Sequence, residues 1–168
     1  MKLDRHVDER GFFARSYADD EFAAHGLPTG WPQSNLSRTD APHTLRGMHY
    51  NAAPHGEAKL VRCVRGAIWD AIIDLRVGSP TRLRWFGAEL SAENGDALYI
   101  PKGFAHGFVT LQEDCDILYQ MGAVYAPAAG RGLRFDDPQV GIAWPVTPKL
   151  MSERDRTYPD FDAAIFDG

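Results

Sequence analysis

Short apolar runs separated by tight turns dominate the chain from Lys59 to Tyr125, and this pattern restricts the folds that it can adopt. The runs have strand-like patterns and end at turn signals such as Gly78-Ser79-Pro80-Thr81. We predict strands at Phe12–Tyr17, Trp31–Arg38, Leu45–Tyr50, Lys59–Val64, Ala67–Leu75, Arg82–Leu90, Ala97–Ile100, Phe104–Leu111 and Cys115–Tyr125. Many short strands at close spacing indicate a β-sandwich or barrel rather than a doubly wound α/β fold.

Two details of this pattern concern how the strands are connected. The strands at Lys59–Val64 and Ala67–Leu75 are separated by little more than Gly66, so we expect them to pair as a hairpin. Short helices are predicted only at Asp19–His25 and at a start in Ser152–Asp155. We therefore expect one domain over residues 1–168, with peripheral helices and an irregular tail from about residue 127.

Composition excludes some classes of function. The chain has 168 residues, enough for one domain with a substantial core, and its net charge of -5 argues against nucleic acid as the main partner. It contains neither an apolar stretch of membrane-spanning length nor an N-terminal signal pattern, so we expect a cytoplasmic protein without a membrane partner. Cys63 and Cys115 lie in apolar runs and are predicted to be buried free thiols.

The stretch from Leu45 to Gly66 carries charged side chains where a plain core strand would carry aliphatic ones. His49 can accept a proton near neutral pH, and the Lys59 ammonium group can stabilise a developing enolate. Together they suit removal of a proton next to a ketone. Inversion of that carbon also needs an acid on the opposite face, for which Tyr119 is the candidate. The simpler alternatives are a hydrogen-bonded core histidine and a core tyrosine.

The segment from Gly95 to His106 resembles the second motif of the cupin superfamily. In metal-binding cupins this histidine is a ligand, and the first motif supplies two more histidines and a glutamate. Here Asn51 and Lys59 stand at two of those positions, and an ammonium group would repel a divalent cation. The resemblance therefore implies an all-β cupin jelly roll without a metal. An alternative metal site would combine three histidines: His49, His55 and His106.

Longer segments closely resemble the dTDP-4-dehydrorhamnose 3,5-epimerase family, in its order and close to its spacing from about residue 4 to residue 160. The matching segments include Arg10-Gly11-Phe12-Phe13, Gln33-Ser34-Asn35, Leu45-Arg46-Gly47-Met48-His49-Tyr50, Lys59-Leu60-Val61-Arg62-Cys63-Val64, Ile100-Pro101-Lys102-Gly103-Phe104-Ala105-His106 and Ile142-Ala143-Trp144-Pro145. The resemblance implies epimerisation at C3, C5 or both of a nucleotide-linked 4-keto-6-deoxy sugar. Family enzymes use no cofactor or metal and are homodimers.

The resemblance also implies roles for single residues. The catalytic residues would be His49 as the base, Asp155 as its carboxylate partner, Tyr119 as the acid and Lys59 as the cation near the sugar oxygens. The substrate-binding residues would be Arg46, His106, Gln33, Asn35 and Tyr125. Arg10 and Phe13 would bind across a dimer through an exchanged N-terminal strand. Independently, Asp70 and Asp74 alternate with Ile68 and Ile72, so either could face the pocket, and Asp70 is the preferred candidate for a second carboxylate near His106.

Two positions depart from the family pattern. Arg15 stands where members commonly have a glutamate that reads thymine, and Asn51 replaces the usual glutamine. Both leave the nucleotide preference open. The alternatives are a mono-epimerase acting on another nucleotide sugar, a keto-sugar isomerase, a non-catalytic sugar-nucleotide-binding cupin, and a metal-dependent dioxygenase.

Overall fold

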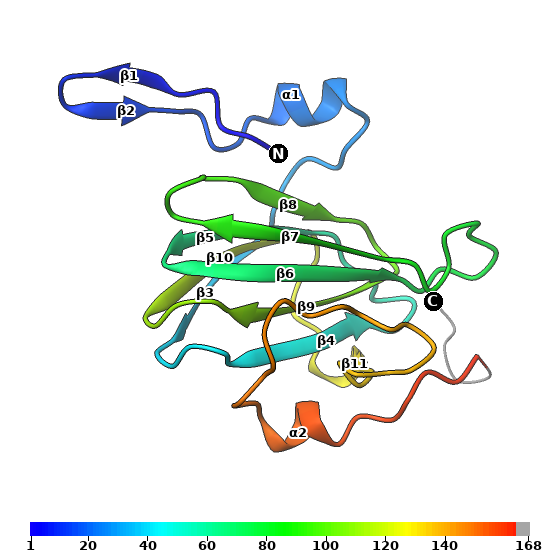
Figure 1. Ribbon diagram of the computed structural model, residues 1–168. Helices are drawn as coiled ribbons and strands as arrows, with labels where there is room; N and C mark the ends of the chain where they lie inside the picture. Colours follow the sequence, from blue (N-terminus) through cyan, green and yellow to red (C-terminus); the bar gives the residue numbers. More distant parts are fainter. Residues whose placement is uncertain (164–168) are drawn as a thin grey trace.

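The computed structural model describes residues 1–163, and its longer strands form two antiparallel sheets that face each other (Figure 1). The first sheet contains β3 (Gln33–Thr39), β10 (Cys115–Met121), β5 (Lys59–Arg65) and β8 (Ala97–Ile100), in that order. The second contains β11 (Gly130–Gly132), β4 (Leu45–Asn51), β9 (Phe104–Thr110), β6 (Ala67–Asp74) and β7 (Trp85–Ser91). The predicted all-β cupin jelly roll is confirmed.

The main core lies between the two sheets. Alternate residues of each strand point inward, so apolar side chains from both sheets meet there. Its buried members include Val61, Cys63, Ile68, Phe108 and Ile117. Toward one end of the sandwich the inward positions become polar: Lys59 precedes Val61 on β5, and His106 precedes Phe108 on β9. This change from apolar to polar residues leaves room for a pocket between the sheets.

The predicted hairpin of Lys59–Val64 with Ala67–Leu75 is wrong. β5 pairs with β8 and β10, whereas β6 pairs with β7 and β9, so the two strands belong to opposite sheets. Gly66, at φ +74°, carries the chain across, and a Cβ there would lie 2.7 Å from the sulfur of Cys115. Glycine is needed at this position because other residues rarely adopt that conformation and the space is filled.

The N-terminal segment also differs from prediction. The expected strand at Phe12–Tyr17 is reduced to β2 (Gly11–Phe13), which pairs with β1 (His6–Asp8) in a hairpin that stands away from the sandwich (Figure 1). The predicted helix is present as α1 (Asp19–Ala24). Its Phe22 is buried with Leu60 and Ala97 on the outer face of the four-stranded sheet.

The tail expected from about residue 127 contains η1 (Pro127–Ala129), β11 and α2 (Glu153–Arg156), and its last five residues lie outside the described range. It covers the outer face of the five-stranded sheet, where Leu133 and Phe161 join a second core with Met48 and Ile73. The N–H of Leu45 donates to the carbonyl of Leu150 at 2.8 Å. These contacts bring α2 beside β4. Within residues 1–163, no helix is long and apolar enough to cross a membrane.

Candidate active site

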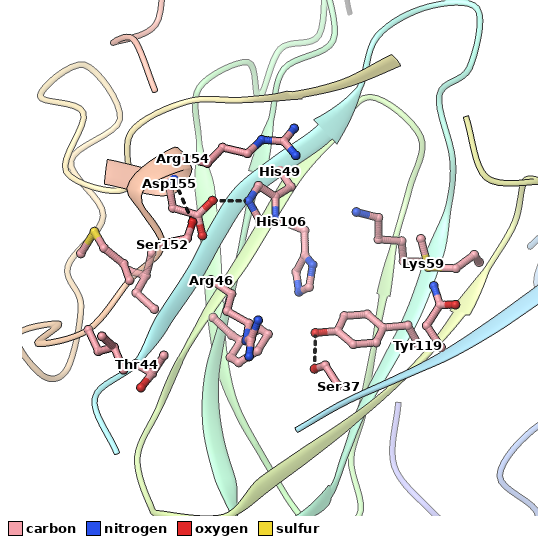
Figure 2. Close-up of a pocket in the computed structure, with 16 residues that line it drawn as sticks. Ser37, Thr44, Arg46, His49, Lys59, His106, Tyr119, Ser152, Arg154 and Asp155 are labelled. Carbon is pink, nitrogen blue, oxygen red and sulfur yellow. Dashed lines mark hydrogen bonds and ion pairs between the residues drawn. The ribbon is translucent and has the colours of Figure 1, made fainter. Parts of the chain in front are cut away.

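A pocket of about 650 Å³ opens between the sheets at the polar end of the sandwich (Figure 2). Strands of both sheets and the tail contribute to it, so its walls come from widely separated parts of the sequence. The lining residues are Asn35, Ser37, Thr44, Leu45, Arg46, His49, Lys59, His106, Phe108, Tyr119, Met121, Leu150, Met151, Ser152, Arg154 and Asp155.

His49 and Asp155 form a hydrogen-bonded pair at one wall of the pocket. Nε2 of His49 lies 2.7 Å from Oδ1 of Asp155, whose side chain is only 5% exposed. Ser152 caps α2 by accepting a hydrogen bond from the N–H of Asp155 at 3.0 Å, which fixes the start of this short helix. Burial acts to raise the pKa of Asp155, but hydrogen bonds from His49 and the Gly47 N–H outweigh it and hold that pKa below its usual value. The ionised carboxylate orients the imidazole.

A second histidine and carboxylate lie beside this pair. His106 of β9 is the register partner of His49 on β4, and its Nε2 lies 2.8 Å from Oδ1 of Asp70. Both side chains are almost completely buried. The suggested placement of Asp70 near His106 is therefore confirmed. His106 also lines the pocket.

Tyr119 enters the pocket from the sheet opposite to His49. Its hydroxyl lies 3.3 Å from Oγ of Ser37, on the neighbouring strand β3 (Figure 2). Burial raises the pKa of this phenol well above its ordinary value. The group therefore stays protonated at neutral pH and is available as a proton donor.

Lys59 lies at the start of β5 with its side chain 11% exposed. Its Nζ is 3.5 Å from Oε1 of Glu57. Burial lowers the pKa of Lys59, while the carboxylates of Glu57 and Asp70 oppose that shift. Lys59 thus places its Nζ in a poorly solvated part of the pocket, beside the carboxylate of Glu57.

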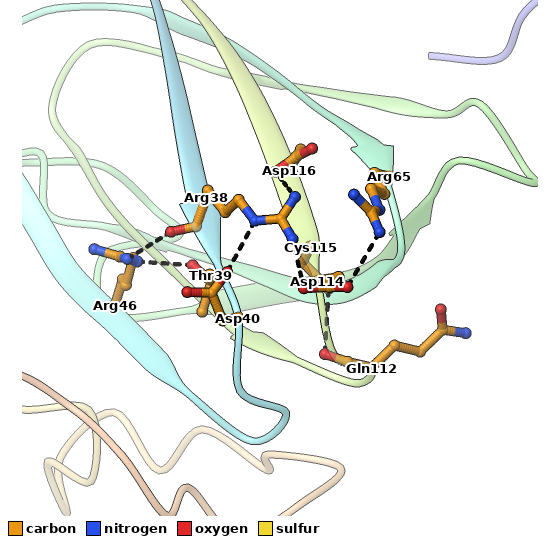
Figure 3. Close-up of polar contacts among 9 residues, drawn as sticks. All are labelled: Arg38, Thr39, Asp40, Arg46, Arg65, Gln112, Asp114, Cys115 and Asp116. Atoms are coloured by element: carbon orange, nitrogen blue, oxygen red, sulfur yellow. Dashed lines mark hydrogen bonds and ion pairs between the residues drawn. The ribbon is translucent and has the colours of Figure 1, made fainter.

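The guanidinium of Arg46 is hydrogen-bonded to the last two residues of β3. Its Nε donates to the hydroxyl of Thr39 at 3.0 Å, and Nη2 donates to the carbonyl of Arg38 at 3.1 Å. Arg38 is itself held by carboxylates on the surface of the molecule (Figure 3). These are Asp40, Asp114 and Asp116. The guanidinium of Arg46 is thereby fixed at the edge of the pocket.

The other predicted site residues are distributed in three places. Asn35 lines the pocket and accepts a hydrogen bond from the amide of Gln33 at 3.1 Å. Tyr125 lines an adjoining hollow of about 170 Å³, which also borders His49 and Lys59. Arg10 and Phe13 lie on the exposed N-terminal hairpin, and neither is among the described residues that line these two cavities of the chain.

The two residues that depart from the family pattern, Arg15 and Asn51, lie in different parts of the structure. Arg15 is exposed and lies 3.5 Å from the carboxylate of Glu21, whereas Asn51 lines the smaller hollow. Within the described part of the chain, no group of three or more His, Cys, Asp or Glu residues is arranged to hold a metal ion.

Some pocket residues were missed at the level of sequence. Ser37 shares the inward face of β3 with Asn35, so strand alternation could have identified it. Arg154 precedes Asp155 and lines both cavities. Glu57 lies two residues before Lys59, in a loop whose conformation gives no periodic signal.

Chemically, the pocket combines an oriented imidazole, an opposing phenol and fixed cations, which suits removal and return of protons beside a polarised carbonyl.

Comparison with known proteins agrees with this chemistry, because the matched proteins are sugar epimerases. Residues 1–163 match the family model described as dTDP-4-dehydrorhamnose 3,5-epimerase. The chain is 44% identical over 153 residues to such an epimerase from Sinorhizobium fredii, covering 90% of this chain and 78% of that protein. It resembles the crystal structure of a 3,5-epimerase from Bacillus anthracis with TDP and PPi bound, at 37% identity and a TM-score of 0.92, covering 95% of this chain and 91% of that one.

The chain is also similar to a 3'-monoepimerase from Streptomyces bikiniensis, whose structure was solved in complex with dTDP-quinovose. The identity is 35% and the TM-score 0.88, with 95% of this chain and 81% of the other covered. Proteins with this fold and a comparable degree of similarity thus include both double and single epimerases.

Proposed function

This chain belongs to the dTDP-4-dehydrorhamnose 3,5-epimerase family, and on that premise we propose which of its side chains carry each step of the reaction. The enzyme is an isomerase that epimerises C3, C5 or both of a nucleotide-linked 4-keto-6-deoxy sugar. The observation that carries the assignment of roles is the His49–Asp155 pair on one wall of the pocket, with Tyr119 entering from the opposite sheet.

His49 is the base. Because its Nε2 is engaged by Asp155, Nδ1 is the nitrogen left to accept a proton from the sugar carbon, at C5 or at C3. Where both carbons are inverted, the imidazolium, whose side chain is 41% exposed, releases the first proton to solvent before it accepts the second. The carboxylate of Asp155 stabilises the imidazolium that forms. Electrons from the broken C–H bond move onto the C4 carbonyl oxygen and give an enolate, which the ammonium group of Lys59 stabilises.

Tyr119 is the acid. Its phenol is too weak an acid to lose a proton to water, but an enolate carbon is basic enough to take one. Donation from the wall opposite to His49 delivers the proton to the other face of the carbon and inverts it. The phenolate that remains is then reprotonated from solvent or through Ser37, whose hydroxyl is within reach.

The other pocket residues bind the substrate. Arg46 and His106 supply hydrogen-bond donors for the sugar and the diphosphate, and Arg46 adds a positive charge. Gln33 and Asn35 offer amides toward the nucleotide from β3. Tyr125 offers an exposed ring from the adjoining hollow, suited to contact with a base.

We further infer a homodimer in which the N-terminal hairpin is exchanged. Every residue of β1 and β2 is exposed in the single chain, including Phe13 at 74%. An isolated two-stranded hairpin is only marginally stable, and β3 is an edge strand with an unpaired side. Docking of the hairpin on a second copy would cover both and bring Arg10 and Phe13 to the partner's pocket.

We also propose one catalytic domain over residues 1–168 and a cytoplasmic location. The tail supplies Asp155 to the pocket and covers the outer face of the five-stranded sheet, which supports a single unit. Cys63 and Cys115 are free and buried, which fits a compartment where thiols stay reduced.

The test is deuterium exchange followed by proton NMR. The enzyme is incubated in heavy water with dTDP-4-keto-6-deoxyglucose, and a His49→Ala variant serves as the control. Loss of both the H3 and H5 signals, dependent on His49, would support double epimerisation. Loss of one signal would identify a mono-epimerase, and loss of neither would contradict action on this thymidine-linked sugar.

A further inference from the structure

The surroundings of Lys59 disfavour its positive charge. The side chain is 11% exposed, and burial lowers the pKa of its ammonium group. On its own sheet its register partners are uncharged, Ile100 on β8 and Met121 on β10. Across the pocket and around it lie Arg46 and His49 of β4, His106 of β9, Tyr119 of β10, Arg154 and Asp155 of α2, and Asp70 of β6. Two of these are permanent cations.

Both carboxylates in this set have another partner. Asp155 is hydrogen-bonded to His49, and Asp70 lies 2.8 Å from His106. Glu57 is different: it lies outside the sandwich strands, and its Oε1 lies 3.5 Å from Nζ of Lys59. Its side chain is only 10% exposed, which is unusual for a glutamate in a loop unless its charge is compensated.

We propose that Glu57 is a positioning residue whose carboxylate keeps Lys59 protonated and directed into the pocket before the substrate oxygen arrives. The inference rests on the proposed role of Lys59 as the cation that stabilises the enolate. A neutral amine at this position would offer a hydrogen bond but no charge, so the enolate would lose its main electrostatic stabilisation. Glu57 therefore acts on the reaction through Lys59.

The titration of Lys59 tests this directly and without substrate. The full-length protein is labelled with ¹³C-lysine, and the Cε signal of Lys59 is assigned by its absence in Lys59→Arg. The remaining lysines, Lys2, Lys102 and Lys149, serve as internal references. In Glu57→Gln the pKa of Lys59 should fall by about one pH unit or more, since an opposite charge at this distance favours the charged form.

Two further variants guard against an indirect effect. Glu113→Gln removes an exposed carboxylate in the turn before β10 and should leave the Lys59 titration unchanged. Glu57→Asp keeps the charge and should shift the titration less than Glu57→Gln. An unchanged Lys59 titration in Glu57→Gln, or an equal shift in Glu57→Asp, would overturn the proposal.

Activity gives a second readout. The alkaline limb of kcat against pH should move to lower pH in Glu57→Gln in parallel with the Lys59 titration, with KM changed less than kcat. Loss of activity with an unmoved alkaline limb would count against the proposal. If the titration shifts as expected but the wild-type enzyme exchanges neither H3 nor H5, the pairing of Glu57 with Lys59 stands and the proposed substrate fails.

Discussion

The imidazole of His49 is hydrogen-bonded to the carboxylate of Asp155, which lies 106 residues further along the sequence. The distance between Nε2 and Oδ1 is 2.7 Å. His49 lies on a central strand of the five-stranded sheet, whereas Asp155 lies on a four-residue helix of the tail. The pair therefore exists only when the tail is folded against β4. This relationship makes the proposed base dependent on a carboxylate outside the sandwich.

Replacing Asp155 by Asn should lower kcat/KM about 10-fold to 100-fold. The expected loss corresponds to a charge-assisted hydrogen bond of about 1.5–3 kcal/mol that stabilises the imidazolium. The measurement is the initial rate of deuterium exchange at H5. Asp136→Asn, which alters an exposed carboxylate paired with Arg134, is the control and should retain activity. Wild-type exchange in Asp155→Asn would exclude this role.

The same carboxylate should contribute to stability in a pH-dependent way. The pKa of Asp155 is lower in the folded chain than in the unfolded chain, so the ionised group stabilises the fold above the unfolded pKa of about 3.9. That contribution is lost as the pH falls through the folded pKa. The difference in free energy of unfolding between wild type and Asp155→Asn should therefore shrink from pH 6 to pH 3. Denaturant titrations at a series of pH values would reveal a constant difference if the expectation is wrong.

Replacing Tyr119 by Phe should separate exchange from inversion. His49 can still remove and return a proton on its own face, so exchange at H5 should continue while formation of the inverted product falls about 100-fold or more. Both are read from one NMR time course. Tyr99→Phe, on the outer face of the four-stranded sheet, provides the matched control. Equal losses of exchange and inversion in Tyr119→Phe would argue against its role as the opposing acid.

Thr39→Val should weaken substrate binding without affecting the proposed catalytic base, His49. It removes the hydroxyl that accepts from Nε of Arg46 while nearly preserving shape, and Thr39 is almost completely buried. The loss of one such bond, about 0.5–1.5 kcal/mol, predicts a KM raised about 2-fold to 10-fold. Thr39→Ser keeps the hydroxyl and should restore KM. A variant with altered kcat and unchanged KM would not fit this expectation.

Mixed dimers should reveal whether the N-terminal hairpin is exchanged. His49→Ala and Arg10→Ala are each expected to be impaired as homodimers. In a mixed dimer, the pocket of the Arg10→Ala subunit would receive an intact Arg10 from its partner, so activity should return at up to half the wild-type sites. If Arg10 serves its own pocket, co-refolding the two variants would restore no activity.

The pocket residues of β4 and β5 could be predicted because their chemistry contradicts the apolar pattern of a core strand. His49 and Lys59 lie at positions where a core strand would carry apolar side chains, and both line the pocket. Asp155 could be named only from the family resemblance, because an irregular tail has no periodicity to indicate which side chain faces inward. Glu57 was missed for the same reason.

The fold could be predicted to the level of its class, but not in its pairing. The sequence around Gly66 indicates a turn between two strands, and a turn of this kind serves equally for a hairpin or for a crossing between sheets. In the structure Gly66 lies against Cys115, on a strand that follows far along the chain, and the sequence around the turn does not indicate this neighbour. Similarly, β2 ends at Phe13 although the apolar pattern continues, because the segment after it leaves the hairpin for α1.

The part of the tail from Leu133 onward, which carries Asp155, follows every strand of the two sheets along the chain. During synthesis on the ribosome, both sheets can therefore close around the pocket while His49 still has no carboxylate beside it. Hydrogen bonds such as that from Leu45 to Leu150 then draw the tail into place and complete the pair. The proposed base therefore gains its carboxylate only when this last segment folds against β4, and we expect a single protease cut between Gly132 and Ser152 to lower deuterium exchange at the sugar carbons.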